Sequence, residues 1–432
     1  MPESVYVVIL LKATAALVMA GLAVGACWLL AGRKMPQRVT LGLAWWVLLP
    51  ILWALGGVAV VTRFTGGLGA MTNLSDTFPW GIWIGFDVLS GVALSAGGFL
   101  MAGAVYILGL KKFYPILRPA ILTAYLGYLL VVGGLLIDLG RPYNIWHPMI
   151  YWQHHSVMFE VGWCVTLYNI VLTVEFLPLL LEKFHWNRAL RIVHAITIPV
   201  VIAGVILSTL HQSSLGALFL IVPEKLWPIT YSPLLPLYFL ISAVAVGLAM
   251  TIVESTLSAR AFQRSLEAPI IASLARAIPL VIILLLAIRA IDMTVRGAWI
   301  YLAPRPFQTF TFLVNMILLL VPTFVLLKLN SRLISQPRIV FWSAVSVVAA
   351  VILNRLNVAW FRMLPSAETI YVPSWQELAV TFNLVSLGVV CFGLAARYLP
   401  LFEHPDIGGD HRTHAASGPV KLPGEAEAGE HV

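Results

Sequence analysis

The chain has 432 residues, of which 60% are hydrophobic and 11% are charged. Soluble globular proteins are about half apolar and about one quarter charged, so this chain has too few charges to cover a water-facing surface. The composition therefore excludes a soluble enzyme. Its mean hydropathy of +0.91 and its length suffice for about ten helices of some twenty residues each. We expect an all-α polytopic membrane protein, with about ten to eleven transmembrane helices in packed helical bundles.

The formal net charge is +8, because 27 lysine and arginine residues outnumber 19 acidic residues. In a membrane protein such an excess lies in the loops that set orientation, so we expect no nucleic-acid partner. The three cysteines, Cys27, Cys164 and Cys391, lie in apolar stretches and form no CxxC motif. We therefore expect no iron–sulfur cluster or structural zinc in this chain, and any electrons must come from another subunit.

Hydrophobic runs bounded by charges, proline and glycine predict eleven membrane spans. The predicted spans cover residues 4–31, 40–62, 79–108, 118–138, 156–181, 190–212, 233–256, 268–291, 307–328, 337–355 and 375–397. Residues 1–38 are expected to form an extra N-terminal helix with a basic loop, although Val24-Gly25-Ala26-Cys27 resembles a lipoprotein cleavage site. Residues 39–402 then form the main membrane domain, and the polar residues 403–432 a disordered cytoplasmic tail.

Basic residues concentrate in alternate loops, such as the one with Lys111, Lys112 and Arg118. Such loops face the cytoplasm, which predicts a cytoplasmic C-terminus and, with eleven spans, a periplasmic N-terminus. The opposite loops are longer and rich in tryptophan, tyrosine, proline and histidine. We expect that outer face to dock a partner or to shape an entrance.

Ionisable groups inside spans are costly, so each is by default a functional hypothesis. Asp87 in the third span shares a helical face with Gly91, Ser95 and Gly98. Small residues there permit close helix packing, so Asp87 either hydrogen-bonds a neighbouring helix or relays protons.

The fourth span ends at Asp138, and Arg141 follows three residues later. The two side chains could simply pair with each other. The next loop adds His147, His154 and His155, which makes the polar group at this membrane face denser than an aromatic belt needs.

Two further spans carry polar stripes. The fifth has Glu160, Cys164, Tyr168 and Glu175, and its two acids are separated by 15 residues, a rise of about 22 Å. This stripe suits a proton path, or the acids pair with basic loops. The sixth span ends near His211, which either caps its helix or serves a quinone oxygen as donor or acceptor.

A bilayer haem usually needs two histidines on facing helices at matched depth. His194 and His211 are the histidines in or at the edges of the predicted spans, and they share one helix, 17 positions apart. We therefore expect no haem.

Six sequence runs together resemble a known family. They are FPWGIWIGFDVLSG (78–91), IDLGRPYNIWHP (137–148), SVMFE (156–160), LHQSSLG (210–216), VPSWQELAV (372–380) and RYLP (397–400). With them the chain resembles the HybB-like integral membrane subunits of nickel–iron hydrogenases, within the wider NrfD/PsrC family. The resemblance covers about residues 40 to 404 and departs at the N-terminus, where this chain adds a span.

The resemblance implies a quinone-binding subunit of a respiratory oxidoreductase in the bacterial inner membrane, without a redox centre of its own. A periplasmic nickel–iron hydrogenase, with large and small subunits, and a ferredoxin-like iron–sulfur subunit would deliver electrons to menaquinone or ubiquinone. Proton translocation coupled to this step is left open. Alternatively, the donor is a multihaem cytochrome or a sulfur-metabolism module. A secondary transporter and a purely structural anchor are the rivals from other classes.

The predicted site residues fall into three overlapping groups. Asp138, Glu160 and His211 are the candidates for proton transfer to quinone. Asp138, Arg141, His147, His155 and His211 are the candidates for quinone binding. Asp87, Glu175, His194 and Glu254 are the candidates for a proton path toward the cytoplasm. We predict no metal site.

Overall fold

The structure is a computed structural model. It describes residues 43–76, 78–303, 306–363 and 371–402, together with scattered residues between Lys12 and Ala26. These ranges contain ten helical segments that are long and apolar enough to cross a membrane, and they contain no strand. The predicted all-α polytopic fold is thus confirmed, and the chain is a multi-pass membrane protein. The proposed first span, residues 1–38, and the tail, residues 403–432, fall largely or wholly outside the described residues.

The spans follow the predicted hydrophobic runs to within a few residues at most ends. Their helices are α2 (Leu43–Gly66), the compound third span described below, α5 (Tyr114–Asp138), α7 (Val157–Lys183), α8 (Asn187–Ala217), α9 (Leu235–Ala261), α10 (Ala268–Val295), α11 (Pro306–Lys328), α12 (Pro337–Leu356) and α13 (Trp375–Tyr398). Short helical turns occupy several loops, among them α6 (His147–Ile150). The largest difference from the prediction is at α8, whose span continues to Ile221 instead of ending at residue 212.

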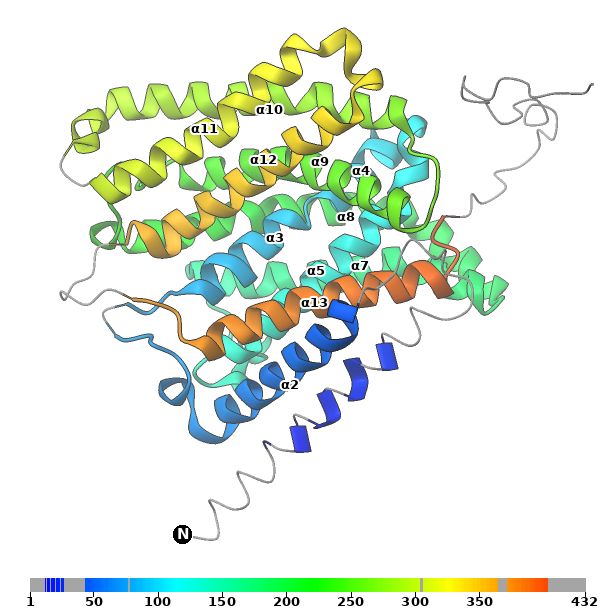
Figure 1. The fold of residues 1–432 in the computed structure, drawn as a ribbon, viewed down its shortest axis with the longest axis horizontal. Helices are drawn as coiled ribbons and strands as arrows, with labels where there is room; N and C mark the ends of the chain where they lie inside the picture. The colour runs from blue at the N-terminus through cyan, green and yellow to red at the C-terminus, as the bar shows by residue number, and fades with distance from the viewer. Residues whose placement is uncertain are drawn as a thin grey trace, which may run out of the picture.

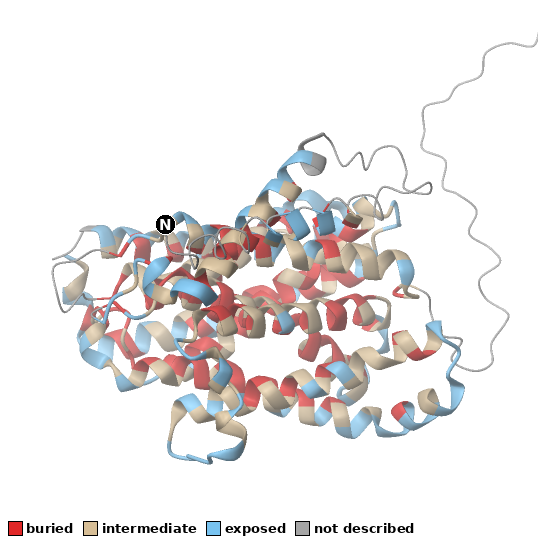
Figure 2. Ribbon diagram, turned by 90° about the horizontal axis from the view of Figure 1, so that it is seen from below, coloured by how far each residue is buried: buried red, intermediate tan, exposed pale blue. Residues whose placement is uncertain are grey.

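The helices lie side by side along one common direction (Figure 1). Helices α9, α10, α11 and α12 pack together in one group, while α2 packs on α13 at the opposite side of the bundle. Between them, α5 contacts the third span, α7 and α13, and α7 packs along α8. Buried residues concentrate along the inward-facing sides of the helices, and exposed residues cover the periphery (Figure 2).

The third span is built of short irregular segments, and the span of α12 also ends in a π-helical segment, η10 (Asn357–Phe361). The third span consists of η2 (Trp83–Ser90), α3 (Gly91–Leu94), α4 (Gly97–Ala102) and η3 (Gly103–Ile107), of which η2 and η3 have the wide turns of a π-helix. Such turns are rare and occur frequently at functional sites.

Small residues bring the third span close to α5, as their spacing indicated. A Cβ atom added to Gly98 would lie 2.4 Å from the Cβ of Ala124, and one added to Gly127 would lie 2.0 Å from the Ser95 hydroxyl. Larger side chains at either glycine would therefore force the two helices apart.

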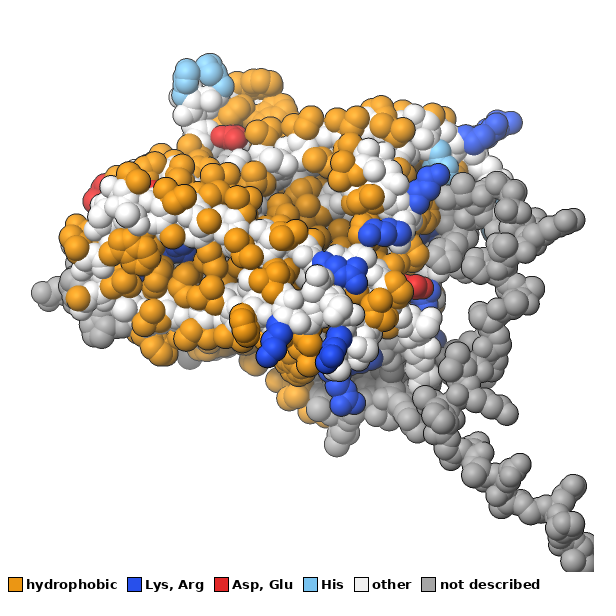
Figure 3. Space-filling model, turned by 90° about the horizontal axis from the view of Figure 1, so that it is seen from above, with side chains coloured by type: hydrophobic (Ala, Val, Ile, Leu, Met, Phe, Trp, Pro, Cys, Tyr) orange, Lys and Arg blue, Asp and Glu red, His pale blue; other side chains and the backbone are white. Residues whose placement is uncertain are grey.

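The bundle has two chemically different ends. We call the end at which α5 finishes and α7 begins the Asp138 end, and the opposite one the Arg118 end. Lysine and arginine side chains gather at the Arg118 end, whereas histidines and apolar side chains mark a projecting segment at the other end (Figure 3). This distribution agrees with the loop charges of the sequence.

Candidate functional site

A fully buried histidine lies near the Asp138 end of α8. His211 is six residues before the last residue of that helix, about 9 Å along its axis, and its exposed fraction is 0%. Its Nδ1 atom lies 3.1 Å from the hydroxyl of Tyr128 on α5. Its Nε2 atom has no hydrogen-bond partner. A buried polar nitrogen without a partner is costly, so Nε2 is a candidate ligand-binding atom.

Polar groups continue from His211 toward the middle of the bundle. The ring of Tyr128 packs edge-on against Tyr168 of α7, with 4.6 Å between the ring centres. Ser208, one turn before His211, lies beside both phenol groups. The hydroxyls of Tyr168 and Ser208 are buried, and within this group their neighbours are one another and the Tyr128 hydroxyl. Hydroxyl groups in such a row can pass a proton by small rotations.

Glu175 extends this row by a further two turns of α7. One of its carboxylate oxygens, Oε2, is buried without a partner. The other lies against Gly204 of α8, where an added Cβ would be 3.3 Å from Oε1 and 3.7 Å from the Tyr168 ring. The absence of a side chain at Gly204 thus leaves room for the carboxylate between α7 and α8. We call His211, Tyr128, Tyr168, Ser208 and Glu175 the buried polar row.

A second polar cluster lies at the Asp138 end itself. The hydroxyl of Thr381 on α13 donates to Asp87 Oδ2 at 2.7 Å, and Asp87 is 7% exposed. Asp138 is close enough to Asp87 for the two acids to interact electrostatically. The guanidinium of Arg63 on α2 lies beside Asp138 and donates to the carbonyls of Ile137 and Leu139.

Glu377 anchors the neighbouring loop to the first turn of α13. It accepts from the Tyr371 hydroxyl at 2.5 Å and from the backbone amides of Ser374 at 2.8 Å and Asn73 at 3.2 Å. Ser374 completes a capping box by accepting from the Glu377 amide. Burial, followed by the hydrogen bond to Glu377, raises the pKa of Tyr371, so this phenol stays protonated.

The two polar clusters are joined by α5 and do not touch directly. Tyr128, the partner of His211, lies ten residues before Asp138, a rise of about 15 Å. In the described residues no hydrogen bond or ion pair links Asp138 to His211. Their action as a unit on one quinone therefore stays a prediction.

The remaining predicted residues lie outside both clusters. Arg141, His155, Glu160 and His194 are exposed. His147 is half-buried and packs on Trp146 and Tyr151, at ring-centre distances of 4.3 and 5.2 Å. Glu254 on α9 lies beside Thr123 of α5, and its Oε1 is buried without a partner. Asp138 forms no ion pair with Arg141, and the cation close enough to interact with it is Arg63.

Sequence reasoning missed Tyr128, Arg63 and Glu377 as parts of the site. Tyr128 reads as one more aromatic residue in an apolar helix, and only its contact with His211 reveals a role. Arg63 and Glu377 lie at the ends of spans, where charges are ordinary. The signal that could have found them is burial, since Arg63 is 3% and Glu377 1% exposed.

His211 is 0% exposed and its Nε2 atom is buried. A small molecule therefore reaches this atom only if the side chains that cover it move.

Comparison with known proteins identifies the family. Residues 70–360 match the family described as "Polysulphide reductase, NrfD". The chain belongs to the NrfD family. It is 30% identical over 365 residues to a "Probable Ni/Fe-hydrogenase 2 b-type cytochrome subunit" of Escherichia coli, which covers 83% of this chain and 92% of the relative. This match confirms the predicted resemblance to HybB-like members of the family.

Two other relatives come from Nitratidesulfovibrio vulgaris. One, named simply "Protein", is 39% identical over 82% of this chain and 94% of its own length. The other is a "Menaquinone reductase, integral membrane subunit", 28% identical over 83% of this chain and 92% of its own length. The relatives of this NrfD protein thus include membrane subunits of hydrogenase and quinone-reductase complexes.

The name of the Escherichia coli relative includes a b-type cytochrome, so we tested whether a bis-histidine haem fits. Of the histidines in the described spans, His194 is exposed and shares α8 with His211. Nδ1 of His211 is already hydrogen-bonded to Tyr128. The described residues therefore do not supply two axial histidines on facing helices.

Proposed function

We propose that this NrfD protein is the quinone-binding membrane subunit of a respiratory hydrogenase complex. In this proposal a periplasmic nickel–iron hydrogenase and a ferredoxin-like iron–sulfur subunit supply electrons at the Asp138 end, which faces the periplasm. Menaquinone or ubiquinone accepts them within the membrane domain. The observation that carries the proposal is the unpaired, fully buried Nε2 atom of His211 at that end. The similarities to a hydrogenase subunit and to a menaquinone reductase subunit support it.

Quinone reduction consumes two protons and two electrons, so the site needs proton donors as well as an electron supply. The Tyr128 hydroxyl can donate to Nδ1 of His211, which leaves the proton on Nε2. That N–H can then donate to a quinone oxygen on which charge develops. Asp138, near Asp87 and Arg63, is the proposed donor for the second oxygen.

The buried polar row suggests how His211 regains its proton. Tyr128, Ser208, Tyr168 and Glu175 follow one another toward the middle of the bundle. Arg118 and Glu182 form an ion pair of 2.7 Å at the Arg118 end, where protons from the cytoplasm would enter. Glu254, with its unpaired oxygen beside α5, is a branch of the same proposed path, whereas His194, being exposed, is its weakest member.

The test compares quinone reduction with dye reduction in the purified complex. We expect His211→Ala and Asp138→Asn each to lower hydrogen-dependent reduction of a menaquinone analogue by about two orders of magnitude. Hydrogen-dependent reduction of a viologen dye should persist, because the dye takes electrons before the membrane subunit. Ser213→Ala, which removes a hydroxyl of the same helix that bonds only the Leu210 carbonyl, is the matched control. If dye reduction and quinone reduction fall equally, these residues only maintain the structure of the complex and take no part in quinone chemistry.

A different catalytic partner is the nearest alternative, because a relative from Mesobacillus selenatarsenatis that is named as part of a selenate reductase also matches a portion of the chain. Selenate accepts electrons, so in that arrangement the membrane subunit would oxidise quinol instead of reducing quinone. The full chain is purified with its native partners, and hydrogen oxidation by the purified complex is measured. Hydrogen oxidation supports the hydrogenase complex, because the alternative complex would not oxidise hydrogen.

A further inference from the structure

A second polar region lies in the group of α9, α10, α11 and α12, away from the buried polar row. A cavity opens between these four helices near the Asp138 end. Arg289, Tyr238, Ser242, Thr230 and Asn315 supply polar groups to its wall, and the rest of the wall is mostly aliphatic. No function is proposed above for any of them.

Three arginines surround this cavity. Arg289 lines it directly. Arg355, which is 0% exposed, donates to the Ser242 hydroxyl at 2.9 Å, and Arg362, 1% exposed, donates to the Thr230 hydroxyl at 3.3 Å. Both hydroxyl-bearing residues belong to the cavity wall. The three cations therefore converge on one small space inside a membrane protein.

Aromatic rings pack against each of these cations. The guanidinium carbons of Arg289 and Arg362 lie 5.1 and 5.5 Å from the centre of the same Phe312 ring. That of Arg355 lies 3.7 Å from the centre of Phe239. A ring face attracts a cation but carries no net charge, so these contacts leave the positive charge uncompensated.

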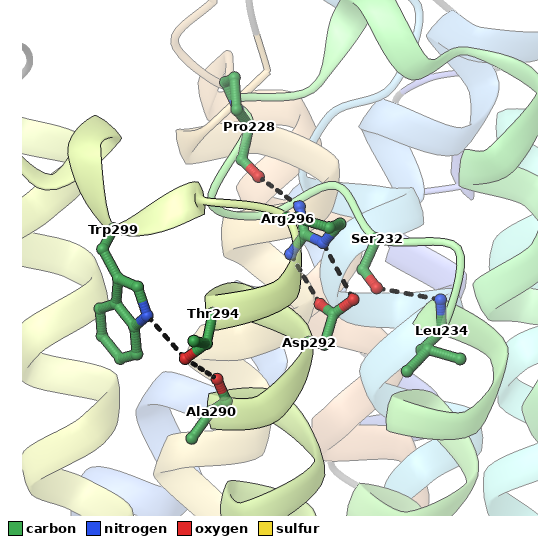
Figure 4. A network of polar contacts seen from close by, with 8 residues as sticks. All are labelled: Pro228, Ser232, Leu234, Ala290, Asp292, Thr294, Arg296 and Trp299. Carbon is green, nitrogen blue, oxygen red and sulfur yellow. Dashed lines mark hydrogen bonds and ion pairs between the residues drawn. The ribbon is translucent and has the colours of Figure 1, made fainter.

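The acid of this region, Asp292, is close enough to Arg289 to interact with it electrostatically, but its two strongest hydrogen bonds go to another arginine. Asp292 accepts from Arg296 through both carboxylate oxygens, at 2.9 and 2.7 Å (Figure 4). Within the described residues, no carboxylate forms an ion pair with Arg289, Arg355 or Arg362. Arginine keeps its proton in proteins, so neutralisation by proton loss is not open to these side chains.

An unused hydrogen-bonding atom accompanies the unpaired charge. Nε of Arg355 has no hydrogen-bond partner, whereas the hydroxyl of Tyr238, a cavity residue that is 9% exposed, lies beside Asp292 and Ser232. The Arg355 nitrogen can donate. A region with surplus positive charge and an unused donor matches an anion, which accepts hydrogen bonds and supplies negative charge.

We propose that the cavity between α9, α10, α11 and α12 binds a small inorganic anion of halide size, which compensates the charges of Arg289, Arg355 and Arg362. The small space and the donor-only character of the charged groups favour a halide over a larger organic acid. The anion stabilises the packing of α9, α10, α11 and α12 and takes no part in quinone chemistry. The inference therefore stands independently of the proposed function.

The test measures thermal unfolding of the full-length purified protein at constant ionic strength while chloride replaces gluconate. A ligand that binds only the folded state raises its midpoint with a saturable dependence on ligand concentration. We expect an increase of about 2 °C or more in chloride, and a similar one in bromide. Arg289→Gln, at a half-buried position that is the least disruptive of the three, should abolish the difference between the salts.

Arg276→Gln is the matched control, because Arg276 lies on the same helix but is exposed at its other half. It should keep the full chloride effect. A further variant, Glu368→Gln, tests whether the carboxylate of Glu368, six residues after Arg362 in the sequence, compensates the arginines in place of an anion. An unchanged chloride effect in this variant supports the proposal.

Crystals grown in bromide give a second readout that does not depend on stability. Anomalous density beside Arg289 and Tyr238 supports the proposal. Equal unfolding midpoints in chloride and gluconate would overturn it, as would a bound phospholipid whose phosphate occupies the arginine cluster.

Discussion

Nδ1 of His211 lies 3.1 Å from the hydroxyl of Tyr128, and Nε2 of the same ring has no partner. One contact thus determines which nitrogen of a buried imidazole is available to a ligand. The tyrosine comes from α5 and the histidine from α8. The orientation of the imidazole ring is therefore fixed by the packing of these two helices and not by the residues next to His211 in the sequence. A histidine positioned in this way presents one constant hydrogen-bonding face.

Tyr128→Phe removes the partner of Nδ1 and leaves the ring in place. We expect quinone reduction to fall about tenfold, less than for His211→Ala, because one buried hydrogen bond is worth about one kcal/mol or somewhat more. The double variant should be no worse than His211→Ala alone, since Tyr128 acts through the histidine. Additive losses, measured as kcat in the purified complex, would show that Tyr128 has an independent role.

Glu175→Gln keeps the shape of the side chain but cannot carry a proton. We expect kcat for quinone reduction to fall by one to two orders of magnitude, while KM for the quinone stays the same, because Glu175 lies away from His211. Glu175→Asp, which retains the acid, should recover much of the rate. A change in KM alone would assign Glu175 to binding and remove it from the proton path.

Arg63→Gln should destabilise the Asp138 end. The buried guanidinium satisfies the carbonyls of Ile137 and Leu139 at the end of α5, and the shorter amide cannot reach both. We expect the free energy of unfolding to fall by about 1–3 kcal/mol, followed as a lower thermal midpoint. An unchanged midpoint together with lost quinone reduction would instead make Arg63 a partner of Asp138 in the chemistry.

Tyr371→Phe tests the pH dependence of the loop contact with Glu377. The folded protein raises the pKa of Tyr371 above its ordinary value near 10, so the protonated phenol stabilises the fold. That contribution is complete below about pH 10 and is lost as the pH rises further, through the raised pKa. The thermal midpoint of the unmodified protein should therefore fall more steeply above about pH 10 than that of Tyr371→Phe.

Tyr143→Phe, in an exposed loop, is the control for this measurement. It should keep the pH dependence of the unmodified protein. Identical curves for all three proteins would mean that the Tyr371 contact does not contribute to stability.

Hydropathy predicted the ten described spans well, because each hydrophobic run has to cross the same thickness of lipid. Gly91, Ser95 and Gly98 also indicated that the third span packs closely on a neighbouring helix, although not that this neighbour is α5. The side of a helix on which a residue lies could not be predicted: Glu160 and His194 are exposed, although their positions along the sequence look similar to those of Glu175 and His211. Which side of a helix faces a neighbour depends on tertiary packing, and the hydrophobic helices have little amphipathic signal to reveal it.

The cluster at the Asp138 end draws on helices from both extremes of the sequence. Arg63 lies on α2, Asp87 and Asp138 follow, and Thr381 belongs to α13, the last described helix. During synthesis the first three groups enter the membrane long before Thr381 leaves the ribosome. Until then Asp87 lacks its hydrogen-bond donor, and α2 lacks the helix against which it packs. A chain that stops short of α13 would therefore carry an exposed carboxylic acid in the bilayer, a feature by which the cell's membrane proteases could distinguish unfinished copies from complete ones.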